Sequence, residues 1–220
     1  MQFDIKGNPD YGHVDFMLDP GETILVESGA MAYMSSHLDL TSRCMGGFVQ
    51  ALLRKVLTSE SLMMGEYKSA SKPAELSISP SLPGQVLHEK LDGSRKLMLQ
   101  PGAFLACTPG INLVPVFGGL KAIFSGEGLF FLECSGKGEL FYNAYGAIIE
   151  KEVNGTFIVD TGHVVGWDPS LEWTIKGMGN IFSTIFSGEG LVIEFTGKGR
   201  VFLRTRHVAG LVGWLSGYCR

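Results

Sequence analysis

Three glutamates recur at the same place in a repeated stretch of the chain. They are Glu60, Glu127 and Glu189, and the last two stand in an identical FSGEGL sequence. Three carboxylates gathered around one axis could coordinate a cation or bind a basic partner. Alternatively, a residue that is repeated along with its fold can be a folding requirement, paired with basic groups or turn amides of its own module. The sequence favours the second interpretation, and we expect no cofactor and no metal.

Histidine supplies the other candidate chemistry, because a cupin-like metal enzyme needs histidines clustered with a glutamate. The five histidines are dispersed and form no H-x-H pair: His13, His37, His88, His163 and His207. Among them His163 is the candidate binding residue, because Trp167 and Asp168 lie close by on an expected β segment. A cupin-like enzyme acting through a metal or a small molecule therefore stays open as an alternative.

The sequence contains partial matches to two known catalytic motifs, and both are incomplete. Residues 160–162 (DTG) look like the aspartic-protease signature, but they occupy the turn position of residues 19–21 (DPG), and a second, facing DTG is missing. Residues 135–138 (SGKG) lack the Ser or Thr that would ligate magnesium in a phosphate loop. We therefore expect no catalytic residue, while the question of enzyme activity stays open.

Composition narrows the class of protein. The chain has 220 residues, of which 45% are hydrophobic and 18% charged, as in a globular protein. Its net charge of -4 has the wrong sign for a dedicated nucleic-acid binder, and the basic residues are scattered. No nucleic-acid partner is expected.

Cysteine usage and the first residues indicate a cytoplasmic protein. The four cysteines are far apart and form no C-x-x-C pair: Cys44, Cys107, Cys134 and Cys219. Such isolated thiols fit a reducing compartment. Asp4 and Asp10 stand where a signal peptide would be basic and apolar, so no secretion signal is expected. No apolar run approaches the roughly 18 residues that span a bilayer.

The candidate residues would be positioned by a turn-and-strand unit that occurs three times. LDPGETILVESGAMAYM begins at Leu18, LQPGAFLACTPGINLVPVF at Leu99 and VDTGHVVGWDPSLEWTIKG at Val159. With each unit comes a glycine pair or near-pair, and then the stretch that carries the glutamate. The constant order predicts three tandem modules. They span residues 1–83, 84–146 and 147–206, followed by a tail over 207–220.

The expected elements are short strands. Val14, Phe16 and Leu18 alternate with polar residues, which is typical of a strand with one buried face. The SGKG and TGKG sequences lie between apolar runs, so they predict hairpin turns. One helix is expected over residues 48–57, where FVQALLRKVL contains no Gly or Pro. The predicted fold class is all-β, built of β-sandwich or barrel modules.

This arrangement resembles a widespread family of uncharacterised proteins related to altered-inheritance-of-mitochondria protein 24. The resemblance covers nearly all of residues 1–206 and is carried by the LDPGE and LQPGAF turns, the FSGEGL stretches, the SGKG and TGKG segments, and FYNAYG. It implies a fold similar to the tryptophan RNA-binding attenuation protein, namely a short double-stranded β-helix triplicated within one chain. It also implies trimeric or ring-like self-association and no established enzyme activity. The first module departs from it, because Gly126 and Gly128 correspond to Ser59 and Ser61.

Three like modules would close around a pseudo-threefold axis and so remove open sheet edges. Large apolar residues flank the glycine pairs and recur in the tail, and we predict oligomer contacts at Phe48, Phe117, Leu120, Phe182 and Trp214. Plain core packing is the alternative for these residues, and membrane contact is a weaker one. The sequence thus predicts a non-catalytic binding or scaffold protein that self-associates, with a homotrimer favoured. An RNA-binding ring is a second alternative, suggested by the fold analogy alone.

Overall fold

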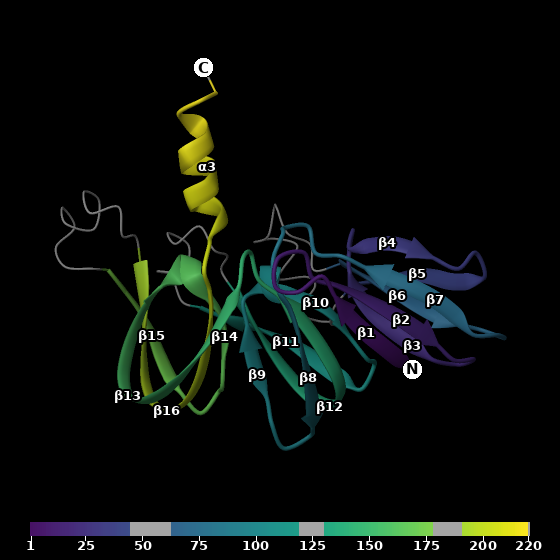
Figure 1. Cartoon of the computed structure of the whole chain (residues 1–220). Coiled ribbons are helices and arrows are strands. Elements are labelled where there is room, and N and C mark those ends of the chain that lie inside the picture. Colours follow the sequence, from purple (N-terminus) through teal and green to yellow (C-terminus); the bar gives the residue numbers. More distant parts are fainter. Residues whose placement is uncertain (45–62, 119–129, 178–190, 220) are drawn as a thin grey trace. The chain divides into compact units, whose positions relative to one another are not determined.

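The computed structural model describes residues 1–44, 63–118, 130–177 and 191–219 (Figure 1). The chain forms two compact units. Unit 1 comprises Met1–Arg95, Phe104–Val114 and Ser135–Asn143, and unit 2 comprises Lys96–Ala103, Pro115–Cys134 and Ala144–Arg220. The chain therefore passes between the units several times, and strand β12 (Phe130–Asn143) contributes residues to both.

Unit 1 contains a four-stranded antiparallel sheet. Its strands are β1 (Gln2–Lys6), β2 (His13–Leu18), β7 (Ala74–Ile78) and β4 (Met31–Met34), in that order. Val14, Phe16 and Leu18 of β2 are buried while the residues between them are not, as their alternation in the sequence predicted. The turn predicted at residues 19–21 follows, and the Glu22 amide donates to the Asp19 carbonyl at 3.0 Å.

A second group of strands in unit 1 includes β3 (Thr23–Glu27). β3 lies between β10 (Phe104–Cys107) and β6 (Met63–Ser69), and β6 also pairs with β5 (Leu38–Cys44). On the other side of β10, the second half of β12 pairs with both β10 and β8 (Val86–Asp92). Large apolar side chains from these strands and the four-stranded sheet form one core that includes Phe16, Leu18, Ile24, Leu76, Leu105 and Phe141.

Unit 2 is organised around the long strand β16 (Leu191–Arg204). β16 pairs with β13 (Ile148–Asp160), β15 (Glu172–Gly177) and β14 (Val164–Trp167). β14 in turn pairs with β9 (Leu97–Leu99), which also pairs with the first half of β12. An aromatic cluster fills the core, with Trp167 fully buried and its ring centroid 4.8 Å from Phe131, 5.4 Å from Phe195 and 5.6 Å from Trp173.

Two copies of the predicted repeat have the same local structure. The 3-10 helix η1 (Pro101–Ala103) precedes β10, and η3 (Thr161–His163) precedes β14. In each copy the following strand has an irregular register against its long partner, between Phe104 and Ala106 in β10 and between Val164 and Gly166 in β14. β11 (Ile111–Phe117) and β15 then follow in corresponding positions.

The hairpins predicted at the SGKG and TGKG sequences are wrong, because both sequences lie inside single strands, β12 and β16. Their glycines instead allow another segment to approach closely. A Cβ on Gly136 would lie 2.3 Å from the Gly110 carbonyl oxygen, and one on Gly138 would lie 2.1 Å from Oγ1 of Thr108. A glycine within a strand thus marks close packing here rather than a turn.

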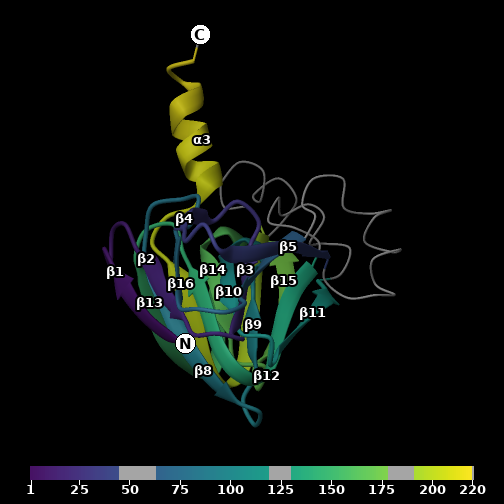
Figure 2. The same cartoon turned by 90° about the vertical axis from the view of Figure 1, so that its right-hand side faces the viewer.

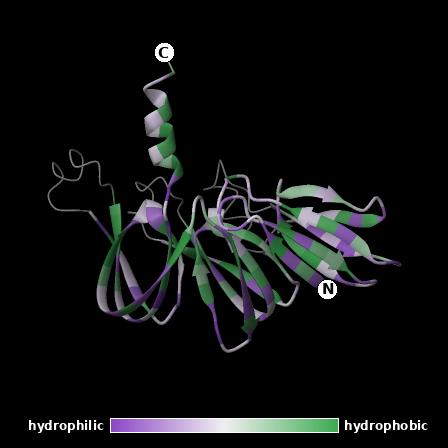
Figure 3. Cartoon of the chain, in the orientation of Figure 1, coloured by the Kyte–Doolittle hydropathy of each residue, from purple (hydrophilic) through white to green (hydrophobic). Residues whose placement is uncertain are grey.

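The chain ends in helix α3 (Val208–Ser216), which projects away from the strands of unit 2 in two perpendicular views (Figures 1 and 2). None of its residues is buried, although its sequence is VAGLVGWLS. In Figure 3, which is coloured by hydropathy, green hydrophobic residues alternate with paler ones along α3. Of the helices that the structure describes, none is long and apolar enough to cross a membrane.

The fold class is therefore predominantly β, with large antiparallel sheets and a short α-helix, as the sequence predicted in outline. The helix expected at residues 48–57 lies outside the described residues. The tandem triplication, its three module boundaries and the pseudo-threefold axis stay predictions.

Candidate functional site

A cavity lies at the base of α3 within unit 2. Its volume is about 540 Å³, which is in the range of small-molecule sites. The lining residues come from the segment before β13, from η3, from the segment between β16 and α3, and from α3 itself. They are Tyr145, His163, Thr205, Arg206, His207, Gly210, Leu211 and Trp214.

His163 is held in place by the turn of η3 and by the end of β16. The Asp160 carboxylate accepts a hydrogen bond from the Gly162 amide at 2.8 Å, which is the turn chemistry that the sequence predicted for residues 160–162. Nδ1 of His163 lies 2.7 Å from the Arg204 carbonyl oxygen. Because a carbonyl oxygen only accepts, Nδ1 carries a proton, and Nε2 of the neutral ring is an acceptor.

His207 has the opposite tautomer because it caps α3. Its Nδ1 accepts a hydrogen bond from the Gly210 amide at 3.2 Å, so in the neutral ring the proton is on Nε2. The rings of His163 and His207 meet edge to face, with centroids 4.9 Å apart. The cavity wall therefore contains one imidazole nitrogen that donates and one that accepts.

The positive charge of the cavity comes from Arg206. This arginine is exposed, and its guanidinium has no hydrogen-bond or ion-pair partner among the residues that the structure describes. The preceding residue, Thr205, is held by the segment before β13: the Ala147 amide donates to its Oγ1 at 3.0 Å, and its own amide donates to the Ala147 carbonyl at 3.0 Å. No carboxylate belongs to the described lining residues. The cavity thus combines a cation and N–H donors with the apolar side chains of Leu211 and Trp214.

The candidate residues from the sequence are distributed as follows. His163 and Trp214 both line this cavity. Phe117 is 50% exposed at the end of β11, and its ring lies 5.6 Å from that of Phe130. The others lie outside the described residues: Glu60, Glu127, Glu189, Phe48, Leu120 and Phe182. The sequence interpretation missed Arg206, His207 and Tyr145 as site residues, although the place of Arg206 and His207 directly before the uncharged stretch 208–219 was a usable signal.

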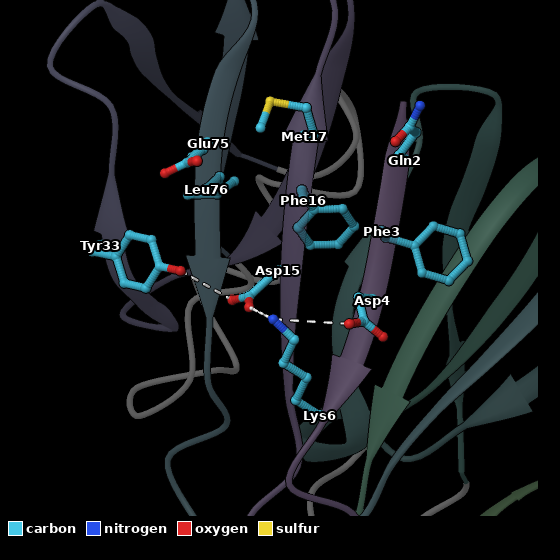
Figure 4. Close-up of a pocket in the computed structure, with 10 residues that line it drawn as sticks. All are labelled: Gln2, Phe3, Asp4, Lys6, Asp15, Phe16, Met17, Tyr33, Glu75 and Leu76. Carbon is cyan, nitrogen blue, oxygen red and sulfur yellow. Dashed lines mark hydrogen bonds and ion pairs between the residues drawn. The ribbon is translucent and has the colours of Figure 1, made fainter.

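A second pocket, of about 330 Å³, lies on the four-stranded sheet of unit 1 (Figure 4). Asp15 is at its centre, 2.9 Å from Nζ of Lys6 and 3.3 Å from the hydroxyl of Tyr33. Its hydrogen bond with Lys6 lowers the pKa of Asp15, and the same bond raises the pKa of Lys6. The charged groups thus satisfy one another, so we interpret this pocket as a surface ion-pair cluster rather than a reactive site.

Two other reactive side chains in the described part of the chain, Cys107 and His88, are engaged or buried. Burial raises the pKa of the Cys107 thiol to about 12, so it is not a thiolate nucleophile near neutral pH. Nε2 of His88 lies 2.6 Å from the Glu139 carboxylate, and its ring centroid lies 4.6 Å from that of Phe3 and 5.0 Å from that of Phe141. Within the described ranges, no three His, Cys, Asp or Glu side chains are grouped to hold a metal ion.

Comparison with known proteins shows what the chain as a whole is similar to. A family model described as mitochondrial biogenesis AIM24 matches residues 3–206. An uncharacterised protein of Streptococcus pyogenes serotype M6 is 27% identical over 227 residues, covering 99% of this chain and 91% of that protein. The crystal structure of a Streptococcus pyogenes protein is similar with a TM-score of 0.82 and 27% identity, covering 99% of each chain.

Proposed function

The chain belongs to the mitochondrial biogenesis AIM24 family, and we propose that it works as a non-catalytic binding or scaffold protein that self-associates. The observation that supports self-association is helix α3. Val208, Val212 and Leu215 are spaced as neighbours along one helix face, and all three are exposed. Soluble monomers rarely leave contiguous apolar surface uncovered, so this stripe fits a contact surface.

The occupant proposed for the stripe is a second copy of the chain. Residues 208–219 contain no charged side chain, so two such helices can pack together without burying a charge. The exposed side chain of Phe117, another predicted oligomer contact, is compatible with further contacts between copies. The trimer suggested by the sequence is the favoured assembly.

The non-catalytic part of the proposal rests on the chemistry of the candidate cavity. Its donors, cation and apolar wall are suited to holding a ligand, whereas a general acid–base mechanism needs a titratable group aimed at a nucleophile or a reacting atom. The two histidines are each engaged through Nδ1 with the backbone, which suits a positioning role.

The test of the self-association surface is the double substitution Val212→Ser and Leu215→Ser, followed by sedimentation velocity. We expect the double variant to sediment as a single chain under conditions in which the unmodified protein sediments as an assembly, because each serine removes apolar area from the contact. The matched control is Ile149→Ser with Ile158→Ser, two residues of β13 that are 49% and 52% exposed. The control should sediment like the unmodified protein.

Two results would overturn this assignment. One is that the variant with the α3 substitutions still sediments as an assembly, whether or not the β13 control dissociates. The other is a single-chain mass for the unmodified protein together with co-sedimentation with lipid vesicles, which would make a membrane the occupant of the stripe.

A further inference from the structure

We infer that the cavity at the base of α3 binds a small organic oxyanion, a carboxylate or phosphate attached to an apolar or aromatic body. This inference deepens the proposed binding role and rests on it, but it is independent of self-association. The stripe proposed for self-association runs through Val212 and Leu215, whereas the cavity is lined by Leu211 and Trp214 on another side of the same helix.

The anionic group is assigned by the donors of the cavity. Arg206 contributes a planar guanidinium with five N–H groups, none of which is engaged by the residues that the structure describes. A carboxylate or phosphate matches this fork with two parallel hydrogen bonds. The described lining contains no carboxylate that would compete for the guanidinium or repel an anion.

The histidines are also compatible with an anionic group in the cavity. His207 can donate from Nε2 while its Nδ1 keeps the α3 cap, so anion binding does not require the helix to give up its first hydrogen bond. His163 keeps its Nδ1 proton on the Arg204 carbonyl, which fixes the orientation of its ring.

The apolar and aromatic lining residues of the cavity indicate the rest of the ligand. Leu211 is half-buried and Trp214 is 62% exposed, so a flat apolar body lying against the indole would cover a surface that water now contacts. Tyr145 adds an aromatic ring from another segment. An anion alone would leave this wall uncovered, and an apolar molecule alone would leave the guanidinium unpaired. The cavity is therefore suited to a molecule with both parts.

Isothermal titration calorimetry on the full chain tests this with four probes. 2-Naphthoate and 2-naphthyl phosphate carry both parts of the proposed ligand, whereas 2-naphthol and inorganic phosphate each carry one. We expect at least one of the two complete probes to bind, and to bind about tenfold or more tightly than either partial probe, because charge-assisted hydrogen bonds and aromatic contact act together. The comparison of the two complete probes identifies which oxyanion is preferred.

The matched variants are Arg206→Gln and Lys151→Gln, the latter removing an exposed charge on β13. Arg206→Gln should weaken binding of the preferred probe about tenfold or more, whereas Lys151→Gln should leave it unchanged. Circular dichroism checks that both variants are folded, and quenching of indole fluorescence provides a second binding signal.

The inference is overturned if neither complete probe binds, if 2-naphthol or inorganic phosphate binds as tightly as the complete probes, or if Arg206→Gln binds like the parent. Sedimentation of the same samples keeps the two proposals apart. A single-chain protein that binds the probe through Arg206 would contradict self-association and support the ligand site. An assembled protein that does not bind the probe would support self-association and contradict the ligand site.

Discussion

Backbone partners determine what each histidine of the candidate cavity can do. His163 and His207 are separated by 44 positions in the sequence, yet their rings meet with centroids 4.9 Å apart. The Arg204 carbonyl fixes the proton of one ring, and the Gly210 amide fixes the lone pair of the other. A residue type alone therefore says little about such a site, since its protonation depends on backbone groups brought in by the fold.

This dependence explains how much of the site was predictable. His163 was identified as a candidate because it stands in a β segment near Trp167 and Asp168. Arg206 and His207 were not, because they become site residues only when the end of β16 lies beside η3. That is a tertiary contact, and periodicity along the chain carries no information about it.

Asp168 offers a stability prediction at the same scale. Its carboxylate accepts hydrogen bonds from the backbone amide, Nε and Nη2 of Arg200, at 2.9, 3.0 and 3.0 Å. Asp168→Ala removes all three bonds and leaves the amide without its acceptor, so we expect the free energy of unfolding to fall by about 2 kcal/mol. Urea denaturation measures the change.

The matched control is Glu194→Ala. Glu194 pairs with Lys176 at 2.5 Å, but the lysine is half exposed, and such surface pairs contribute between about 0 and 1 kcal/mol. Equal losses for the two variants would show that the Asp168 network contributes no more than an ordinary surface pair.

Among the elements, the long strands differ most from the sequence interpretation. Period-two alternation predicted β2 correctly, because one face of that strand is buried. The glycines at residues 135–138 and 196–199 were misinterpreted as turns. The short-range pattern of glycine between apolar runs is the same whether the chain reverses or whether another backbone crosses it, so local sequence could not separate the two.

A glycine substitution tests this packing. A Cβ on Gly110 would lie 2.1 Å from the Lys137 carbonyl oxygen of β12, so Gly110→Ala must displace backbone. We expect the free energy of unfolding to fall by about 1–3 kcal/mol, as for other overpacked sites. Chemical denaturation of the purified variant gives the value.

Gly102 of η1 is the matched control, because a Cβ there would meet no atom within 4 Å. Gly102→Ala should change stability by no more than about 0.5 kcal/mol. If Gly110→Ala were tolerated as well as Gly102→Ala, the close contact between the Gly110 turn and β12 would not contribute to stability.

Helix α3 was not predicted, although the apolar character of the tail was noticed. Gly210 and Gly213 lower the intrinsic helix propensity of this segment, and histidine is not among the preferred N-cap residues. The helix forms with His207 as its cap and with no buried residue. Its exposed apolar side chains are the main reason to expect a partner for this element.

At the scale of the whole molecule, the sequence predicted the fold class but not the grouping of strands. Alternation and frequent glycines indicated a β protein, and the structure is predominantly β in two compact units. β12 contributes to both units, so their limits do not follow from contiguous stretches of sequence. The two copies that share the 3-10 helix and the irregular strand register are what the repeat hypothesis would require of the second and third modules.

Self-association is the central claim, and sedimentation equilibrium of the unmodified chain over a range of concentrations tests it most directly. The account predicts a particle whose mass is a multiple of the 23.8 kDa chain, with three copies favoured. A mass of 23.8 kDa that persists up to the highest concentration would contradict it.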